Sequence, residues 1–251
     1  MLPAAIPVLI PRGAVSSIAS TMKKKSWCVA VLAVGLLLSA RSANAIALGQ
    51  ITNFQDGTLM GWDTGGFATP LENVSTGGPG GVGDRYLRIT SDGAGAGGRL
   101  VAFNFSDWTG NYIAAGVNAI TISLNNQSNV SLSIRIAFQS EIVQGGPGYL
   151  TQAMVLAANS GWQTFTISLA PGSLTAVNSP TAYNTFFTNV AWTRIIHSVG
   201  TGNLNGDFVT GQLGVDNITA VPEPSTAALA AAGLLAFGAA VVRRKLRAAK
   251  S

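Results

Sequence analysis

The chain has 251 residues, of which 10% are charged, and a formal net charge of +5 with an isoelectric point near 9.7. The positive charge lies at the two ends, because residues 46–220 contain five arginines, no lysine and nine acids, a formal charge of −4. Binding to nucleic-acid phosphates needs a basic face, so this central region argues against a nucleic-acid partner.

The single cysteine, Cys28, lies in an apolar stretch near the N-terminus. The region after it therefore has no thiol, which excludes a disulfide framework, cysteine-ligated zinc and a cysteine nucleophile there. A chain of this length is long enough to bury a substantial core. We expect one domain that packing stabilises, between two short terminal segments.

The N-terminal segment has the three parts of a secretory signal peptide. Three lysines follow Met22, an apolar run extends from Trp27 to Ala40, and small residues end the segment at Ala43-Asn44-Ala45. The alternative is a membrane anchor, but fourteen apolar residues are short against the roughly 20 that span a bilayer. We predict cleavage after Ala45, so that residues 1–45 are an upstream extension and a signal peptide, with translation starting at Met22.

The central region alternates apolar and polar residues with the period of β-strands. The clearest alternation covers residues 120–124 and 130–138, and Asn125–Asn129 between them is typical of a hairpin connection. Further strands are expected at residues 86–90, 99–105, 149–156, 163–169, 191–199 and 212–219.

This pattern predicts an all-β fold for residues 46–220, an antiparallel β-sandwich of the jelly-roll type. No segment of the region shows the period of an amphipathic helix. The glycine-rich stretches Gly77–Gly83 and Gly93–Gly98 lack the lysine and the following helix of a phosphate-binding loop, so we interpret them as ordinary loops.

The central region resembles the galactose-binding-like jelly rolls of carbohydrate-binding modules. The resemblance rests on Asn53–Gly57 followed by Gly61-Trp62, on Gly161–Phe165, and on Gly214–Ile218. It implies that the first and last strands lie side by side and that an acid near each holds a structural calcium ion. Asp56 and Asp216 are the matching acids, with backbone carbonyls completing the oxygen shell. The alternative is that both acids form turn and strand-end hydrogen bonds. No other cofactor is expected.

Catalytic arrangements are poorly supported. His197 is the only histidine and lies inside a predicted strand, where a structural role is the simpler interpretation. The region offers no Ser-His-Asp constellation and no obvious transition-metal site. Glu72 and Glu141 are its only glutamates, and no acid pair for glycoside hydrolysis stands out, although acids distant in sequence can meet in space. We predict that the protein is not an enzyme and keep a polysaccharide hydrolase as the least favoured alternative.

Glycan binding needs fewer groups. Arg135 alternates with the apolar residues of its strand, and its guanidinium could donate to sugar hydroxyls, while Trp62 or Trp108 could stack on a pyranose ring. The alternative is that Arg135 is solvated and both tryptophans are core residues, which large aromatic side chains commonly are.

The C-terminal segment, residues 221–251, has three parts. Val221–Ser225 contains two prolines around a glutamate, residues 227–242 are almost wholly apolar, and residues 243–250 are basic. Sixteen helical residues span about 24 Å, near the lower limit for a bilayer. We therefore expect a short transmembrane helix with its arginines on the cytoplasmic side.

Motif, helix and basic cluster in this order resemble the PEP-CTERM sorting signal of Gram-negative bacteria. The resemblance implies that an exosortase recognises Pro222, Glu223 and Pro224 and cleaves the tail, so that the inner membrane holds the protein only transiently. It places the protein at the cell surface or in the extracellular matrix, with a structural or adhesive role linked to exopolysaccharide. A carbohydrate-binding module with a defined glycan ligand is the alternative, and a plain C-terminal anchor is the alternative for the tail.

Overall fold

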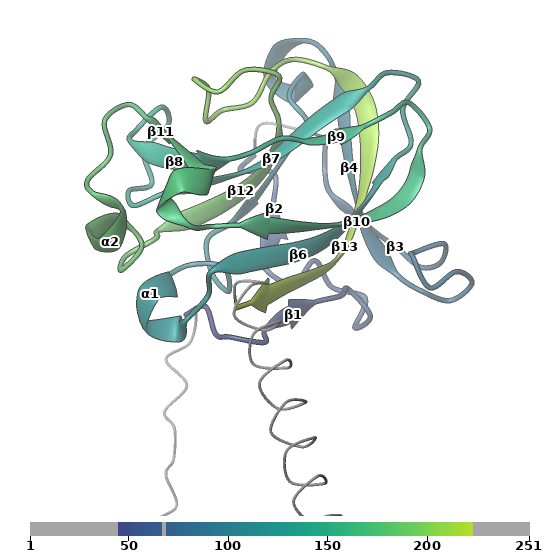
Figure 1. The fold of residues 1–251 in the computed structure, drawn as a ribbon. Helices are drawn as coiled ribbons and strands as arrows, with labels where there is room; N and C mark the ends of the chain where they lie inside the picture. Colours follow the sequence, from purple (N-terminus) through teal and green to yellow (C-terminus); the bar gives the residue numbers. More distant parts are fainter. Residues whose placement is uncertain (1–44, 67–68, 223–251) are drawn as a thin grey trace, which may run out of the picture. The chain divides into compact units, whose positions relative to one another are not determined.

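The computed structural model describes residues 45–66 and 69–222, which form two antiparallel β-sheets. Figure 1 shows the sheets as two layers. The first sheet contains, in order, β10 (Gly161–Ser168), β6 (Ala119–Asn126), β13 (Thr210–Val221), β4 (Tyr86–Asp92) and β3 (Glu72–Val74), with β1 (Ile51–Thr52) paired to β13. The second contains, in order, β11 (Leu174–Val177), β8 (Gly148–Thr151), β7 (Leu132–Gln139), β12 (Trp192–His197), β5 (Val101–Asn104) and β2 (Trp62–Asp63), with β9 (Met154–Leu156) paired to β7.

The prediction of a β-sandwich is confirmed, and helix is confined to single turns in the described residues. These are α1 (Tyr112–Ala115), α2 (Tyr183–Phe186) and the 3-10 turns Gly95–Gly97 and Pro171–Ser173. The predicted signal helix and C-terminal transmembrane helix fall on residues outside the described part of the chain. Within residues 45–66 and 69–222, no helix has the length and apolar character needed to cross a membrane.

The core lies between the sheets and follows the alternation read in the sequence. Alternate residues of β6 and β7 point inward and are at most 1% exposed: Ile120, Ile122, Leu124, Leu132, Ile134, Ile136 and Phe138. The first and last strands of the chain, β1 and β13, are neighbours in the first sheet, with Ile51 opposite Thr219. This adjacency is the one that the resemblance to jelly rolls implied.

The predicted hairpin at Asn125–Asn129 is wrong. β6 pairs with β10 and β13 in the first sheet, whereas β7 pairs with β12, β8 and β9 in the second, so the connection crosses from one sheet to the other. The alternation of apolar and polar residues is the same whether the next strand pairs in the same sheet or belongs to the facing sheet. In both arrangements each strand buries one of its faces.

The segment predicted as one strand at 149–156 divides into β8 and β9. Leu150 is opposite Ala137, but Met154 is opposite Ile134, so the register with β7 shifts by one residue between them. At the break the Thr151 hydroxyl accepts the Ile136 backbone N–H at 2.9 Å and replaces a ladder bond. The shift has the pairing of a β-bulge.

The second sheet is apolar on its outer face as well. Val101, Ala137, Leu150, Val177, Ile196 and Leu204 form a second buried cluster there, with Phe103 packed against it. Leu204 belongs to the connection between β12 and β13, which therefore covers part of this face. The six residues of β12 are all buried, as expected of a strand covered on both sides.

Asn126 stabilises the crossing between the sheets. Its fully buried Nδ2 donates to the carbonyls of Val130 at 2.8 Å and Ala157 at 2.9 Å, and its Oδ1 accepts the Ser128 N–H at 2.9 Å. We predict that Asn126→Ala lowers the free energy of unfolding by about 2 to 4 kcal/mol, because buried backbone groups lose their partners. Urea unfolding measures this.

Asn129 in the same connection is exposed, so Asn129→Ala is the matched control and should change stability by less than about 0.5 kcal/mol. Equal effects of the two substitutions would contradict this account of the crossing.

Candidate functional site

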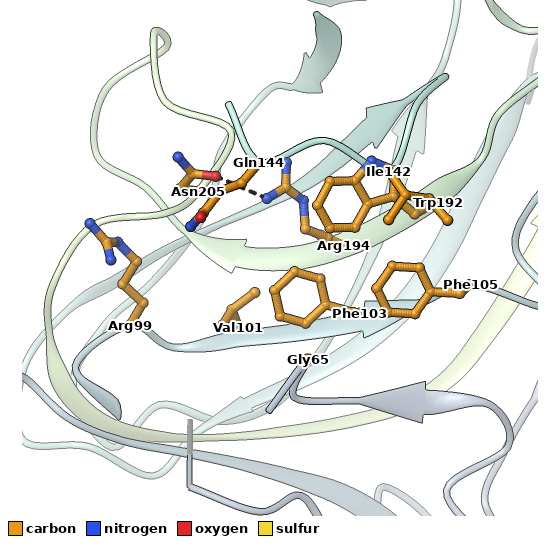
Figure 2. A pocket seen from close by; sticks show the side chains of 10 residues that line it. All are labelled: Gly65, Arg99, Val101, Phe103, Phe105, Ile142, Gln144, Trp192, Arg194 and Asn205. Atoms are coloured by element: carbon orange, nitrogen blue, oxygen red, sulfur yellow. Dashed lines mark hydrogen bonds between the residues drawn. The ribbon is translucent and has the colours of Figure 1, made fainter. Parts of the chain in front are cut away.

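A pocket of about 360 Å³ opens on the outer face of the second sheet, over β5 and β12. Arg194 is directly opposite Phe103 in the ladder, and register partners project to the same side. Val101 and Trp192 are two residues from these partners and share their face. Figure 2 shows the ten lining residues, which are Gly65, Arg99, Val101, Phe103, Phe105, Ile142, Gln144, Trp192, Arg194 and Asn205.

Three aromatic rings, Phe103, Phe105 and Trp192, form what we call the aromatic platform. Each ring centroid lies 5.4–5.8 Å from the other two, and the ring planes are 4–17° apart. If the three rings were stacked in one column, the distance between the two outer rings would be about twice the others. The three distances are similar, so the rings lie side by side with nearly parallel faces (Figure 2). Phe105 is 38% exposed and carries the open end of the platform.

Arg194 holds a buried positive charge against this platform. Its Cζ lies 4.2 Å from the centroid of the Trp192 ring and 5.8 Å from that of Phe103. Its Nη1 donates to Asn205 Oδ1 at 3.3 Å, and its Nη2 donates to Gln139 Oε1. Burial lowers the pKa of the Arg194 guanidinium to about 9, so it remains charged at neutral pH.

The rim of the pocket combines a second guanidinium with amide and apolar groups. Arg99 donates from Nε to the Gly206 carbonyl at 3.0 Å, and its Cζ lies 4.2 Å from the centroid of the Phe208 ring. Gln144 and Ile142 come from the loop after β7, and Ile142 is 65% exposed. The Trp192 Nε1–H is buried and has no hydrogen-bond acceptor among the described residues, so it is not one of the donors open to the pocket. The pocket therefore offers flat apolar faces beside several N–H donors.

The structure places Trp62 and Trp108 away from this pocket. Trp62 is 3% exposed and Trp108 is 1% exposed, and both belong to the core between the sheets. Trp108 Nε1 donates to Thr52 Oγ1 at 3.0 Å, which ties it to β1. A sugar ring cannot reach either indole in this arrangement.

Arg135 and His197 are engaged in structural hydrogen bonds. Arg135 is 5% exposed and donates from Nε to the Ser198 carbonyl and from Nη1 to the Thr151 carbonyl. His197 Nδ1 accepts the Ser133 N–H at 3.0 Å. Burial lowers the pKa of His197, and the charge of Asp207 opposes this. Neither Arg135 nor His197 lines the pocket. The two tryptophans belong to the core between the sheets, so Trp62, Trp108 and Arg135 do not form one binding site.

The sequence analysis did not identify the three aromatic residues that form the platform in the pocket. Phe103 and Phe105 alternate with Ala102 and Asn104 inside a predicted strand, and this spacing was a usable signal for an aromatic face. Trp192 lies 87 positions further along, and only the β5 to β12 pairing brings it to the same face.

The two acids suggested as calcium ligands differ in their surroundings. Asp56 is exposed, and its Oδ1 accepts the N–H of Thr58 at 2.8 Å and the hydroxyl of Thr58 at 2.9 Å. Asp216 is fully buried, and neither of its oxygens has a hydrogen-bond donor in good geometry. Burial raises the pKa of Asp216 to about 7, against a lowering by the Asn217 backbone N–H, and the charge of Asp84 adds to the rise.

Asp84 is held beside a glycine-rich loop. Its Oδ1 accepts from Gln55 Nε2 and its Oδ2 from the Gly80 N–H, both at 2.6 Å. In the described part of the chain, no three acidic, histidine or cysteine side chains cluster as metal ligands. Asp216 thus has two buried oxygens without a donor, and the charge of Asp84 contributes to the rise in its pKa.

Known proteins resemble the two parts of the chain to different degrees. The tail matches a defined sequence motif, whereas the body is similar only to solved structures of low sequence identity. Residues 220–245 match the PEP-CTERM protein-sorting motif, which indicates an exported protein sorted through an exosortase. Of the motif residues, Pro222 ends the described range, and Glu223 and Pro224 lie outside it. No curated protein matches the chain.

Several solved structures are similar to the body, including carbohydrate-binding modules. A family 11 carbohydrate-binding module from Clostridium thermocellum, in complex with a β-1,3-1,4-mixed-linked tetrasaccharide, is 15% identical with a TM-score of 0.45, and the match covers 70% of this chain and 97% of that one. A family 28 carbohydrate-binding module specific for non-crystalline cellulose is 16% identical with a TM-score of 0.42, and the match covers 70% of this chain and 98% of that one. An exo-β-agarase is 10% identical with a TM-score of 0.48, covering 70% and 26%.

The buried acid makes stability depend on pH. The unfolded Asp216 carboxyl loses its proton near its ordinary pKa of 3.8 and the folded one near 7, so the folded state binds more protons between these values. We predict that, in chelator, the free energy of unfolding falls as the pH rises from about 4 to 7, by about 1.4 kcal/mol per unit of pKa difference. Asp216→Asn should remove this fall.

Urea unfolding at a series of pH values measures the effect. Asp56→Asn replaces an exposed acid and is the matched control, which should keep the fall. A pH profile that Asp216→Asn leaves unchanged would show that Asp216 does not hold its proton in the folded state.

Proposed function

We propose that the body is a non-catalytic glycan-binding domain, which the sorting tail delivers to the cell surface or extracellular matrix. The observation that carries the proposal is the aromatic platform beside Arg194 in a surface pocket. Pyranose rings present flat C–H faces and a rim of hydroxyls, so they suit aromatic faces flanked by hydrogen-bond donors. The pocket volume of about 360 Å³ lies within the range of small-ligand sites.

Binding is favoured over hydrolysis at this site. Glycoside hydrolases use two carboxyl groups that flank the scissile bond. The ten lining residues, which all belong to the described part of the chain, include no aspartate or glutamate. We therefore propose a binding protein, and a hydrolase remains the least favoured alternative.

The biological role we propose is structural or adhesive. An exosortase would recognise Pro222, Glu223 and Pro224 and release the body from the inner membrane, after which the pocket would hold it against exopolysaccharide or another glycan. The tail supports the delivery route, and the pocket supports a defined contact with the glycan. A defined pocket supports an adhesive role that acts through a specific glycan ligand, as in a carbohydrate-binding module, over a structural role that needs no ligand.

Phe105 provides the test. It is the exposed member of the platform, so Phe105→Ala should leave the fold intact and remove one stacking face. We predict that this variant binds its glycan about two- to tenfold more weakly, because aromatic stacking contributes about 0.5 to 1.5 kcal/mol. A glycan array finds the ligand and calorimetry measures the affinity.

The matched control is Trp162→Ala, since Trp162 belongs to β10 in the first sheet and does not line the pocket. It should bind as the wild type does. The proposal is wrong if no glycan binds saturably, or if Trp162→Ala and not Phe105→Ala abolishes binding.

We also propose that the body binds a structural calcium ion. Asp216 and Asp84 would supply carboxylate oxygens, and backbone carbonyls would complete the six to eight oxygen ligands that calcium prefers. The support is that Asp216 is buried with both oxygens unpartnered, an arrangement that costs free energy unless a cation or a proton compensates the charge.

Calcium should therefore raise the melting temperature. At a free calcium concentration one hundred times the Kd, the expected gain in the free energy of unfolding is about 2.7 kcal/mol. Asp216→Asn should abolish the gain, and Asp56→Asn should retain it. Calorimetry that shows the same melting temperature in calcium and in EDTA would contradict the proposal.

A further inference from the structure

The residues that line the pocket include two arginines and no carboxylate, and Asp63, opposite Phe103 in the ladder, is an acid on the same face of the sheet. The structure shows one ion pair in residues 45–66 and 69–222, between Arg88 and Glu72, and these residues belong to β4 and β3 of the other sheet. Arg194 is 2% exposed, and its guanidinium donates to the amide oxygens of Asn205 and Gln139, both of which are neutral. Buried charges in proteins are normally paired, so this cation lacks the usual partner.

Contact with Trp192 does not replace that partner. A cation over an aromatic face is attracted by the ring, which holds the guanidinium in place. The N–H donors of a guanidinium lie in its own plane and form a fork with five positions, so stacking leaves the edge free to donate. The two hydrogen bonds to Asn205 and Gln139 occupy only part of this fork.

A second guanidinium reaches the same pocket without an acid. Arg99 donates to the Gly206 carbonyl and lies over the Phe208 ring, and neither contact is anionic. Two cations thus line a pocket that has no carboxylate, in a region whose formal charge over residues 46–220 is −4. Two of the five arginines of residues 46–220 therefore line this pocket.

We propose that the glycan bound here is acidic, with a carboxylate on the sugar ring, as in a uronic acid residue. The inference rests on the proposed glycan-binding function and names its ligand class. The ring would lie on the aromatic platform, and its carboxylate would face the Arg194 edge, with Arg99 holding a neighbouring acidic residue of the polymer. A planar carboxylate matches the planar fork of a guanidinium and accepts two parallel hydrogen bonds.

The acidic body adds selectivity. The formal charge of −4 gives residues 46–220 no net attraction for a polyanion, so the proposed contact depends on the two arginines of the pocket within a Debye length, about 8 Å at physiological salt. Neutral glycans would lose the charge-assisted bonds and leave Arg194 unpaired.

The test compares uronate oligosaccharides with their neutral counterparts on the same protein. Oligomers of galacturonate, glucuronate and mannuronate are titrated by calorimetry beside the same oligomers after reduction of their carboxyl groups to primary alcohols. The acidic form of the preferred oligomer should bind about ten- to one-hundredfold more tightly than its reduced form, because hydrogen bonds between charged groups are the stronger class. Raising the salt concentration should weaken only the acidic form.

Variants identify the cation responsible. Arg194→Gln should remove the preference for the acidic oligomer, and Arg194→Lys, which keeps the charge but not the fork, should retain part of it. Arg88→Gln, in the ion pair on the other sheet, is the matched control and should retain all of it. Thermal melts check that each variant is folded. If Arg194→Gln does not fold, Arg99→Gln replaces it and should reduce the preference.

The outcomes separate this inference from the proposed function. Equal or tighter binding of neutral glycans, still weakened by Phe105→Ala, overturns the acidic ligand and leaves glycan binding standing. Absence of saturable binding to acidic and neutral glycans alike overturns both. A preference for the acidic oligomer that survives in the folded Arg194 and Arg99 variants places the carboxylate elsewhere and also overturns the inference.

Discussion

The packing on the outer face of the second sheet determines where the pocket lies. β5 and β12 carry apolar or aromatic side chains on both faces, so the sheet needs cover on its outer side as well as in the core. The connection between β12 and β13 supplies that cover over Ile196 and Leu150 through Leu204. The cover stops short of Phe105 and part of Phe103, and the pocket lies there, lined also by Trp192, which is 5% exposed.

Arg194 makes this opening chemically specific. An apolar pocket alone would favour any flat hydrophobic ligand, but the guanidinium over Trp192 adds a charge and directed donors beside the rings. The same contact keeps the long side chain ordered before a ligand arrives, which reduces the entropy lost on binding. The proposed recognition therefore depends on one arrangement, a guanidinium stacked on Trp192 at the edge of a partly covered sheet face.

The alternation of residues predicted most of the long strands and the sandwich itself. It could not predict strand neighbours, and the connection at Asn125–Asn129 shows why: β6 and β7 each bury one face, and this holds equally within a sheet and across two. The tryptophans show the same limit. Trp62 and Trp108 are core residues while Trp192 lines the pocket, and this follows from pairings between distant strands that no local pattern contains. By contrast, the tail motif at residues 220–245 is contiguous, so sequence alone was enough to identify it.

The most direct measurement of the central claim is the response of the indole N–H resonances of the four tryptophans of residues 46–220 to an acidic oligosaccharide, followed by NMR on the purified body. Single Trp→Phe variants assign the signals. We predict that the Trp192 resonance shifts as the oligosaccharide is added and that the shift saturates, while the resonances of Trp62 and Trp108 stay in place. A saturating shift at Trp162 with none at Trp192 would place the ligand on the opposite sheet and contradict the account.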